Sequence, residues 1–237
     1  RPTGRNLICE MSVSVSPSVL LATGLLRHAS PAACDRLSRL ARETQHLEGE
    51  LLWQAGTAAA ELTCIRRGLV QIIKPAAAGP AATLGLFGPH ECVGLVAVMG
   101  SHRYPADAVA ISDRVELLHV DAAQFRVELQ QEPQLADAAR EALIQATQML
   151  LAKIDVLTAG EVPQRLATLF LHLVDRFGDV FAHGELRIPV ALSRTVLGRL
   201  VGVRSETVIR VLTRWERSGW LRTDVSNSTS TTDGSGS

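Results

Sequence analysis

Arginine side chains are concentrated near the C-terminus of this sequence. Between Arg187 and Arg222 there are eight arginines and two acidic residues, a local balance of +6. The rest of the chain sums to −6, because the whole sequence has 24 basic and 24 acidic side chains. Clustered arginines displace the counterions condensed on a nucleic-acid duplex, so a basic segment on an otherwise acidic protein favours phosphate binding. The alternative is a solvated arginine face on an ordinary pair of helices.

Two short amphipathic helices are predicted within this basic segment, separated by Gly202. Glycine suits a turn there because it adopts positive φ at little steric cost. Apolar residues at helical spacing form a stripe on each helix, and they are Val196, Leu197, Leu200 and Val201 on the first, then Val208, Val211, Leu212 and Trp215 on the second. Two helices joined by such a turn form a helix-turn-helix, whose second helix can enter the major groove of DNA.

Composition allows one or two domains in these 237 residues, of which 46% are apolar. No run of 18 apolar residues exists, and residues 12–26 lack a secretory cleavage pattern, so we expect a cytoplasmic protein without a membrane span. Met11 is a candidate natural start. The four cysteines, Cys9, Cys34, Cys64 and Cys92, form no C-x-x-C pair, so we expect scattered buried thiols and neither a zinc site nor a tight redox motif.

Short apolar or alternating segments with glycine between them fill residues 45–125, which predicts a β-sandwich or barrel. Short helices, broken at Ser30-Pro31, are expected before it, between Leu20 and Arg42. The expected strands are Leu51–Trp53, Leu62–Ile65, Leu69–Ile73, Thr83–Phe87, Val93–Val98, Ala106–Ile111 and Arg114–Val120.

A long helix is predicted from Glu132 to Leu157. One apolar row on it has the spacing of a two-stranded coiled coil and predicts a dimer interface made by Leu143, Ala146, Leu150 and Leu157. A second row, available to pack on the β-domain, consists of Ile144, Leu151 and Ile154. A helix buried within a single chain is the alternative to a dimer.

Further elements are expected on either side of the helix-turn-helix. A helix is predicted over residues 161–177, followed by a hairpin from Val180 to Ile188 that turns at His183-Gly184. A last strand is expected at residues 220–222. Residues 226–237 are rich in Ser, Thr and Gly, which predicts a disordered tail.

Three segments resemble the Crp/Fnr family of bacterial transcription regulators. They are the recognition-helix core SETVIR, the stretch IRRGLVQI, and FGPHECVGLVAVMG. The resemblance extends over roughly residues 20–223 and implies an α+β fold with three parts. These are a jelly-roll sensor domain of the cyclic-nucleotide-binding type at residues 20–131, a dimerisation helix at 132–158 and a winged helix-turn-helix at 159–225.

The resemblance assigns DNA-contacting roles to residues of the helix-turn-helix. Arginine can pair bidentately with guanine, and a carboxylate can accept from the cytosine amine. Base contacts are therefore expected from Ser205, Glu206, Ile209 and Arg210. Phosphate contacts, which set register without reading sequence, are expected from Ser193, Arg194, Arg204 and Thr207. Two departures weaken the helix caps: Val196 replaces the Glu or Gln of a capping box, and Arg204 stands where a small capping residue is frequent.

The effector is the least determined feature. The cyclic-AMP signature of the family is degraded, since His90 precedes Glu91 where glycine is expected and Tyr104-Pro105 replaces Arg-Ser. We place a candidate effector pocket at His90, Glu91, Arg103 and Tyr104, and do not expect cyclic AMP. We also do not expect an iron–sulfur cluster, because the clustered N-terminal cysteines that hold it in the oxygen-sensing branch of the family are absent. A haem that senses CO or NO is the alternative, with candidate ligands His28, His46, His90, His102 and His119.

Together these features predict a homodimeric, sequence-specific DNA-binding transcription regulator whose sensor domain controls the orientation of the recognition helices. The resemblance implies a palindromic double-stranded operator and RNA polymerase as partners. No cluster of catalytic groups is found, so an enzyme is not expected. A haem-based or redox-sensing regulator of the same family, and a ligand-binding module without DNA binding, are the alternatives.

Overall fold

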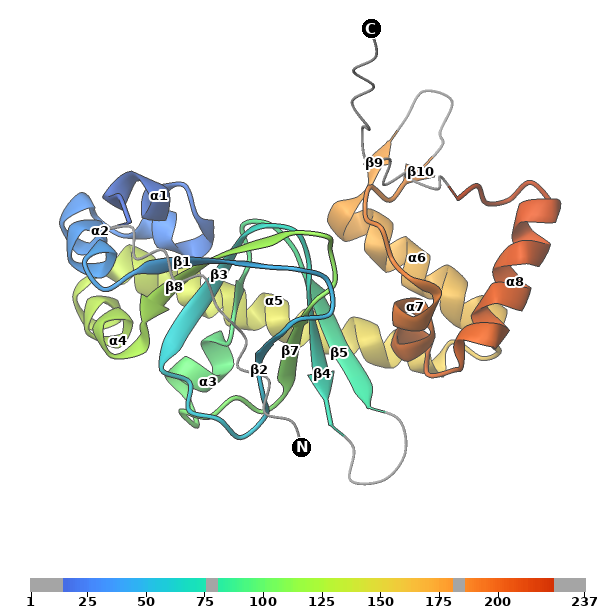
Figure 1. The fold of residues 1–237 in the computed structure, drawn as a ribbon, viewed down its shortest axis with the longest axis horizontal. Coiled ribbons are helices and arrows are strands. Elements are labelled where there is room, and N and C mark those ends of the chain that lie inside the picture. Colours follow the sequence, from blue (N-terminus) through green and yellow to red (C-terminus); the bar gives the residue numbers. More distant parts are fainter. Residues whose placement is uncertain (1–14, 76–80, 181–185, 224–237) are drawn as a thin grey trace, which may run out of the picture. The chain divides into compact units, whose positions relative to one another are not determined.

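The computed structural model describes residues 15–75, 81–180 and 186–223. The chain divides after Thr158 into two compact units, and both are traced in Figure 1. None of the helices in the described ranges combines the length and hydropathy that a membrane span requires.

Two four-stranded antiparallel sheets form the body of the first unit (Figure 1). One has the strand order β1-β8-β3-β6 and the other β2-β7-β4-β5. Gly68, with φ 81°, lies between β3 and β4 as a turn glycine should. The predicted series of short strands with glycine turns is confirmed, apart from the segment Val93–Val98. The strands are β1 Arg42–His46, β2 Leu51–Trp53, β3 Glu61–Arg67, β4 Val70–Lys74, β5 Ala82–Phe87, β6 Cys92–Val93, β7 Asp107–Ala110 and β8 Val115–Asp121.

Short helices precede the sheets, as expected. They are α1 Pro17–Leu21, the 3₁₀ helix η1 Gly24–His28 and α2 Pro31–Ser38. The Ser-Pro break is the start of α2, because the N–H of Ala33 donates to Ser30 Oγ at 3.2 Å. Proline is favourable in the first turn, where its missing N–H has no helical acceptor.

One expected strand is wrong. Val93–Val98 splits into the end of β6 and helix α3, Leu95–Met99. Gly94, with φ 83°, turns the chain out of the sheet, and the next apolar residues make one helical turn instead. A helix that the sequence analysis did not anticipate, α4 Ala122–Gln131, follows β8. Its signal was local, because Asp121 caps it by accepting from the N–H of Gln124 at 2.7 Å.

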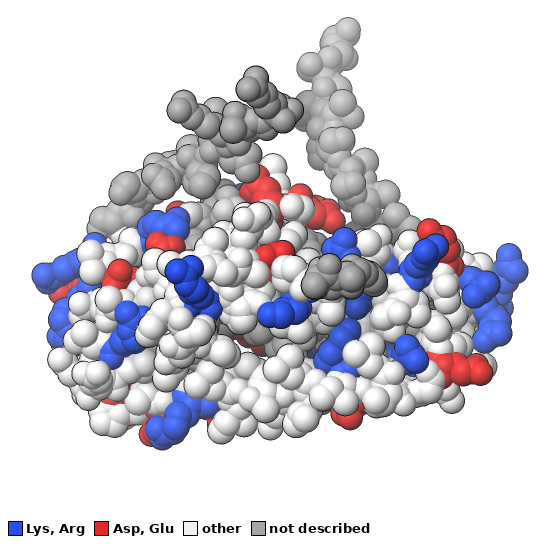
Figure 2. Space-filling view, turned by 90° about the horizontal axis from the view of Figure 1, so that it is seen from below, with Lys and Arg blue, Asp and Glu red and all other residues white. Residues whose placement is uncertain are grey.

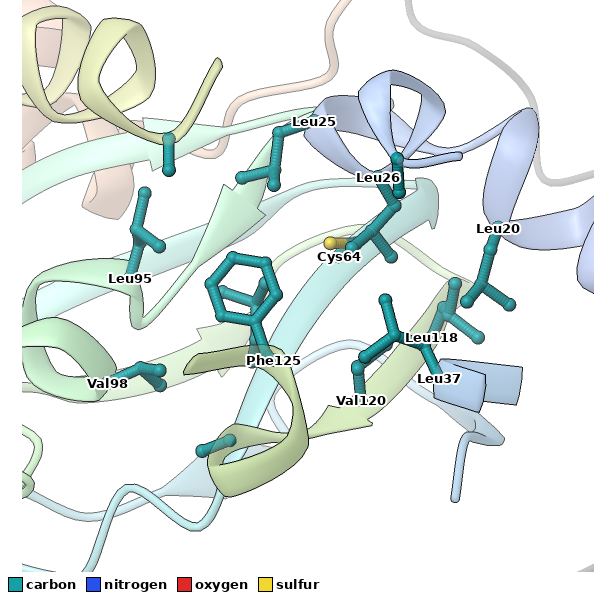
Figure 3. Close-up of a cluster of buried hydrophobic side chains, with 14 of the residues drawn as sticks. Leu20, Leu25, Leu26, Leu37, Cys64, Leu95, Val98, Leu118, Val120 and Phe125 are labelled. Atoms are coloured by element: carbon teal, nitrogen blue, oxygen red, sulfur yellow. The ribbon is translucent and has the colours of Figure 1, made fainter. Parts of the chain in front are cut away.

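The core of the first unit joins the N-terminal helices to β3 and β8. Figure 3 shows Leu20, Leu26 and Leu37 directed toward Leu118 and Phe125. All five side chains are fully buried. Burial of this kind is the main source of folding free energy, at roughly 25 cal/mol per Å² of apolar surface.

Helix α5, Pro133–Thr158, packs on this core through Leu135 and Ala139. Farther along, Met149 lies so close to Gly85 of β5 that a Cβ at Gly85 would collide with its Sδ. Lys153 is partly buried, which lowers its pKa from 10.5 to about 8.

One of the two apolar rows on α5 differs from the prediction. The row expected to pack on the β-domain is exposed, since Ile144, Leu151 and Ile154 have exposed fractions of 51%, 56% and 55%. In the row expected at a dimer interface, Leu143 packs against the core, whereas Leu150 and Leu157 are exposed. The reason is that the rows are offset by one residue, so the same spacing allows either assignment.

The second unit contains three helices and a short hairpin. Its elements are α6 Val162–Phe177, β9 Asp179–Val180, β10 Leu186–Arg187, α7 Arg194–Val201 and α8 Ser205–Arg217. Strands β9 and β10 pair antiparallel, as the expected hairpin requires. The turn predicted at His183-Gly184 and the tail predicted at 226–237 lie outside the described residues.

The strand expected at residues 220–222 is wrong. After α8 the chain reverses through Gly219, which has φ 72°. The N–H of Trp220 donates to the carbonyl of Trp215 at 3.0 Å, which closes the helix end in the manner of a Schellman motif. The Trp220 side chain is 78% exposed, and within the described residues this segment pairs with no strand.

Candidate nucleic-acid interface

Helix α7 begins and ends where its sequence indicates. The N–H of Val196 donates to Ser193 Oγ at 3.2 Å, so Ser193 caps the helix. The return contact of a capping box is absent because position 196 is valine. Gly202 closes the helix with φ 74°, which confirms the expected turn.

Gly198 is a structural residue that the sequence analysis missed. A Cβ at this position would lie 2.7 Å from the carbonyl oxygen of Val203. The backbone of α7 therefore approaches the turn into α8 more closely than any side chain would permit.

Helix α8 buries one face and exposes the other. Val208, Val211 and Leu212 are buried, and the Trp215 ring is tilted against Phe170 of α6 with 6.1 Å between centroids. Glu206, Ile209 and Arg210 are exposed on the helix. Arg204 occupies the N-cap without a side-chain cap, as its chemistry predicts.

A cavity of about 500 Å³ lies between the start of α6 and α8. Arg165, Arg210 and Arg214 line it, together with Thr207. Arg165 Nε donates to the carbonyl of Gly160 at 2.8 Å, which holds that side chain beside the helix start. Within the described part of the chain, no ion pair occupies Arg210 or Arg214. Arg165 and Arg214 were not predicted from the sequence, because they come together only where α6 packs on α8.

The residues expected to contact phosphates fall into two groups. Ser193 and Arg194 stand at the start of α7, and Arg204 and Thr207 at the start of α8. Arg194 Nη2 lies 3.7 Å from Glu216 Oε1 on α8. Helices α7 and α8 pack against each other, so both groups of residues lie on the same pair of helices.

Basic side chains do not form one continuous patch on the face shown in Figure 2. The blue side chains lie as separate groups among uncharged ones.

The four residues of the expected effector pocket are not brought together. His90 and Glu91 line a cavity of about 560 Å³ between η1, the turn before β6, and α5. Arg103 is not among its lining residues and donates from Nη1 to the carbonyl of Gly56 at 2.7 Å. Tyr104 is buried, and that burial raises its pKa to about 12.

The Tyr104 ring is part of the buried core of the first unit. The ring stacks on Trp53 with 4.3 Å between centroids, and the hydroxyl donates to the carbonyl of Glu61 at 2.9 Å. The Glu91 carboxylate also has a partner within the chain, since it accepts a hydrogen bond from the N–H of Gly88 at 2.6 Å.

The five candidate haem ligands do not form one cluster: His46 and His119 meet at the Thr44 hydroxyl, whereas His28 and His90 lie on a different cavity. His119 is buried between Thr44 and Thr63, at 2.8 and 3.0 Å from their hydroxyls. His46 contacts Thr44 and Glu50. His28 and His90 both line the cavity beside α5. Among the described residues, no three His, Cys, Asp or Glu side chains gather as a metal site would require.

The expectation of scattered thiols is wrong for two cysteines. Cys64 of β3 and Cys92 of β6 form a disulfide, and Cys34 is buried as a free thiol. Antiparallel pairing makes Cys64 and Cys92 direct partners although 28 positions separate them. Their spacing in the sequence carries no sign of this pairing. Cys9 lies outside the described residues.

Comparison with known proteins gives two family matches. Residues 43–132 match the cyclic nucleotide-binding domain, and residues 164–232 match the Crp-like helix-turn-helix domain. A similar curated protein is the CRP-like cAMP-activated global transcriptional regulator of Mycobacterium tuberculosis, 24% identical over 86% of this chain and 90% of that protein. The transcriptional activator protein FnrA of Stutzerimonas stutzeri is 28% identical over 75% of this chain and 71% of its own length.

Solved structures share the fold. The regulator CLP of Xanthomonas campestris aligns with a TM-score of 0.66 and 21% identity, over 82% of this chain and 96% of that one. FixK2 of Bradyrhizobium japonicum aligns with a TM-score of 0.65 and 19% identity, over 77% and 88%. With a nucleotide-binding-type roll, a long helix and a Crp-like helix-turn-helix in that order, the chain belongs to the Crp/Fnr family of DNA-binding transcription regulators.

Proposed function

We propose that this regulator binds a palindromic operator as a homodimer, with α8 of each copy in the major groove. The observation that supports this is the division of α8 into a buried apolar face and an exposed face that bears Glu206, Ile209 and Arg210. A helix fixed on one side and chemically varied on the other can present side chains to base edges.

Direct reading of bases falls to residues in the first turns of α8, which are Ser205, Glu206, Ile209 and Arg210. The Arg210 guanidinium suits guanine, the Glu206 carboxylate suits a cytosine amine, and the Ile209 side chain, 48% exposed, suits a thymine methyl group. Phosphate contacts come from Ser193, Arg194, Arg204 and Thr207. The cavity lined by Arg165 and Arg214 beside Arg210 adds one more place for a phosphate oxygen.

The partner that covers the exposed apolar side of α5 is a second copy of this chain. Five large apolar side chains are exposed on this one helix, and they are Ile144, Leu150, Leu151, Ile154 and Leu157. Burial of several such side chains in a helix pair stabilises association by about 1.5–3 kcal/mol each before entropic costs. A dimer also supplies the second recognition helix that a palindrome needs.

The first unit is proposed to act as the sensor that sets how the two recognition helices are oriented. An effector changes the populations of two arrangements of α5, and these differ in the spacing of the helices. The cavity between η1, the turn before β6 and α5 supports this proposal, since α5 supplies a large part of its lining.

The chemistry inside the roll argues against cyclic AMP as that effector. Tyr104 stands where the family has a phosphate-binding arginine, and Pro105 has no N–H to donate. Following the family, we also propose a cytoplasmic location and RNA polymerase as a further partner. The alternative of a haem-based sensor finds support only in His28 and His90 on one cavity, and a visible absorption spectrum of the purified protein tests it.

Selection of duplexes from a random pool by the full-length protein tests the proposed function. The pool should converge on an inverted repeat whose half-sites lie about one helical turn, ~34 Å, apart. Affinity for the selected duplex should fall linearly with the logarithm of salt concentration. A pool that shows no enrichment, or that enriches sites without two-fold symmetry, would contradict the proposal.

A further inference from the structure

The disulfide between Cys64 and Cys92 joins two strands at a point where few other contacts hold them. Strand β6 has two residues, and its register with β3 is only Thr63 with Val93 and Cys64 with Cys92. Two further hydrogen bonds hold the preceding turn. The N–H of Ile65 donates to the carbonyl of Glu91 at 2.8 Å, and the N–H of His90 donates to that of Ile65 at 2.9 Å.

The two sulfur-bearing residues differ in access. Cys64 is fully buried in the apolar core, where Figure 3 shows its sulfur among Leu26 and Leu118. Cys92 is only partly buried and lines the cavity beside α5. A reagent that enters this cavity therefore meets Cys92 first.

We propose that this disulfide is a reversible redox site, opened by a dithiol reductant that attacks Cys92 Sγ. The reductant's thiolate forms a bond to Cys92 Sγ while the Sγ–Sγ bond breaks, and Cys64 leaves as a thiolate that takes up a proton. The second thiol of the reductant then attacks its own sulfur in the mixed disulfide and releases Cys92 as a thiolate, which is protonated in turn. Two electrons reduce the protein, and the dithiol ends as a disulfide.

The immediate surroundings determine what opening the bond changes. A Cβ at Gly24 of η1 would lie 2.6 Å from the carbonyl oxygen of His90 and 3.1 Å from Cys92 Sγ, so η1 rests directly on this turn. Ala138 and Ala142 of α5 line the same cavity. Once the bond is open, the turn at residues 88–91 keeps its hydrogen bonds, including the one from Gly88 to the Glu91 carboxylate, but loses its covalent link to β3. Both η1 and the first half of α5 then pack on a less firmly held turn.

The third described cysteine does not compete for this exchange. Cys34 is buried in α2, and burial raises its pKa above the ordinary 9.0, with Glu132 and Glu128 acting in the same direction. A neutral buried thiol is a poor nucleophile. The disulfide is therefore expected to open and close without rearrangement to Cys34, which serves as an internal reference.

Native-state reduction of the full chain tests the proposal. The air-oxidised protein is titrated with dithiothreitol, and free thiols are alkylated and located by mass spectrometry. Without reductant, Cys64 and Cys92 should carry no label. With reductant, both should become labelled in the folded protein, and reoxidation should remove the labelling. Hydrogen exchange at η1, the turn at residues 88–91 and residues 134–149 should speed up severalfold on reduction, whereas β4 and β5 should not change.

Two variants test the site of attack. Under native conditions Cys92 in a Cys64→Ser variant should be alkylated severalfold faster than Cys64 in a Cys92→Ser variant, and Cys34→Ser should behave like the wild type. The proposal is overturned if the oxidised protein has free Cys64 and Cys92, if the bond opens only after denaturation, or if hydrogen exchange is unchanged on reduction. Because none of these measurements uses DNA, failure of the proposed operator binding would leave their outcome unaffected.

Discussion

Arg194 and Glu216 form an ion pair between the two ends of the helix-turn-helix, with Nη2 3.7 Å from Oε1. Arg194 opens α7 and Glu216 lies near the end of α8. Glu216 also accepts from the Thr223 hydroxyl at 2.6 Å. An arginine expected to hold a phosphate is therefore already beside a carboxylate, and a duplex must compete with that carboxylate.

We expect the Glu216→Gln substitution to strengthen binding to every duplex. It removes a negative charge that faces the same arginine as the phosphate, and a partly exposed pair of this kind is worth about 0.2–1 kcal/mol. Fluorescence anisotropy titrations should therefore show a few-fold gain in affinity, and Asp113→Asn in the first unit should show none. Weaker binding by the variant would mean that Glu216 positions Arg194 for its phosphate.

Arg210 and Arg194 should give different kinds of loss. Arg210→Ala should cost about 1–3 kcal/mol on the selected operator and relax specificity at one base pair. Arg194→Ala should weaken binding to all duplexes alike and reduce the salt slope by about 1. Titrations against single-base operator variants distinguish the two, and Arg39→Ala, in the first unit, is the control. Equal binding of wild type and Arg210→Ala across those operators would refute base reading by this residue.

Substitution of either helix-turn-helix glycine should destabilise the second unit for a different reason. Gly202→Ala places a Cβ on a left-handed residue, at a cost of about 1–2 kcal/mol. Gly198→Ala drives a Cβ into the carbonyl of Val203, so the whole turn must shift and the loss should be larger. Urea unfolding measures the loss of unfolding free energy in both variants. Gly49→Ala, at a positive-φ site where a Cβ meets nothing within 4 Å, is the control for conformation alone. If Gly198→Ala lowered the free energy of unfolding less than Gly202→Ala, the close approach of Gly198 to the Val203 carbonyl would not constrain the fold.

The exposed apolar side of α5 should control assembly. Leu151→Glu places a charge at the centre of that surface, and a buried unpaired charge is strongly unfavourable. Sedimentation equilibrium should show the wild type as a dimer and the variant as a folded monomer. Leu47→Glu, at another exposed leucine outside α5, should remain dimeric. A dimeric Leu151→Glu protein would exclude this surface as the interface.

Local features were predictable from the sequence, and features that depend on strand register or helix packing were not. The buried stripe of α8 and the left-handed Gly202 follow from neighbouring residues, and both were predicted. The partnership of Cys64 with Cys92 depends on the pairing of β3 with β6, which no local pattern specifies. The convergence of Arg165 with Arg214 depends likewise on how α6 meets α8.

The misassigned face of α5 shows a different limit. Its two apolar rows lie one residue apart and have nearly the same spacing, so periodicity alone could not say which row meets the core. In the structure, Ala139 and Leu143 face the core cluster that contains Phe125, and this packing fixes which row is buried. Hydrophobic pattern thus predicted the helix correctly but left its rotation about its own axis undetermined.

His119 should make the free energy of unfolding depend on pH between about 3 and 6.5. Burial, helped by the positive charges of Arg42 and His46, lowers its pKa from 6.5 to about 3. The facing groups are Thr44, Thr63 and Glu61, whose Oε2 lies 3.5 Å from Nδ1. Between these two pH values the unfolded chain binds a proton that the folded chain does not. The free energy of unfolding therefore falls as pH drops below 6.5, by up to ~1.4 kcal/mol per pH unit.

Urea unfolding at pH 7 and pH 5 measures this effect separately from the carboxylates. The bidentate contact with Arg36 lowers the pKa of Glu128 below 4.5, so the stability it supplies is lost only at still lower pH. Wild type and His102→Gln, which changes an exposed histidine, should both lose roughly 2 kcal/mol between the two pH values. The His119→Gln variant should show almost none of this loss, even if it is less stable at pH 7, because glutamine at position 119 binds no proton on unfolding. The same pH dependence in all three proteins would show that His119 titrates normally in the fold.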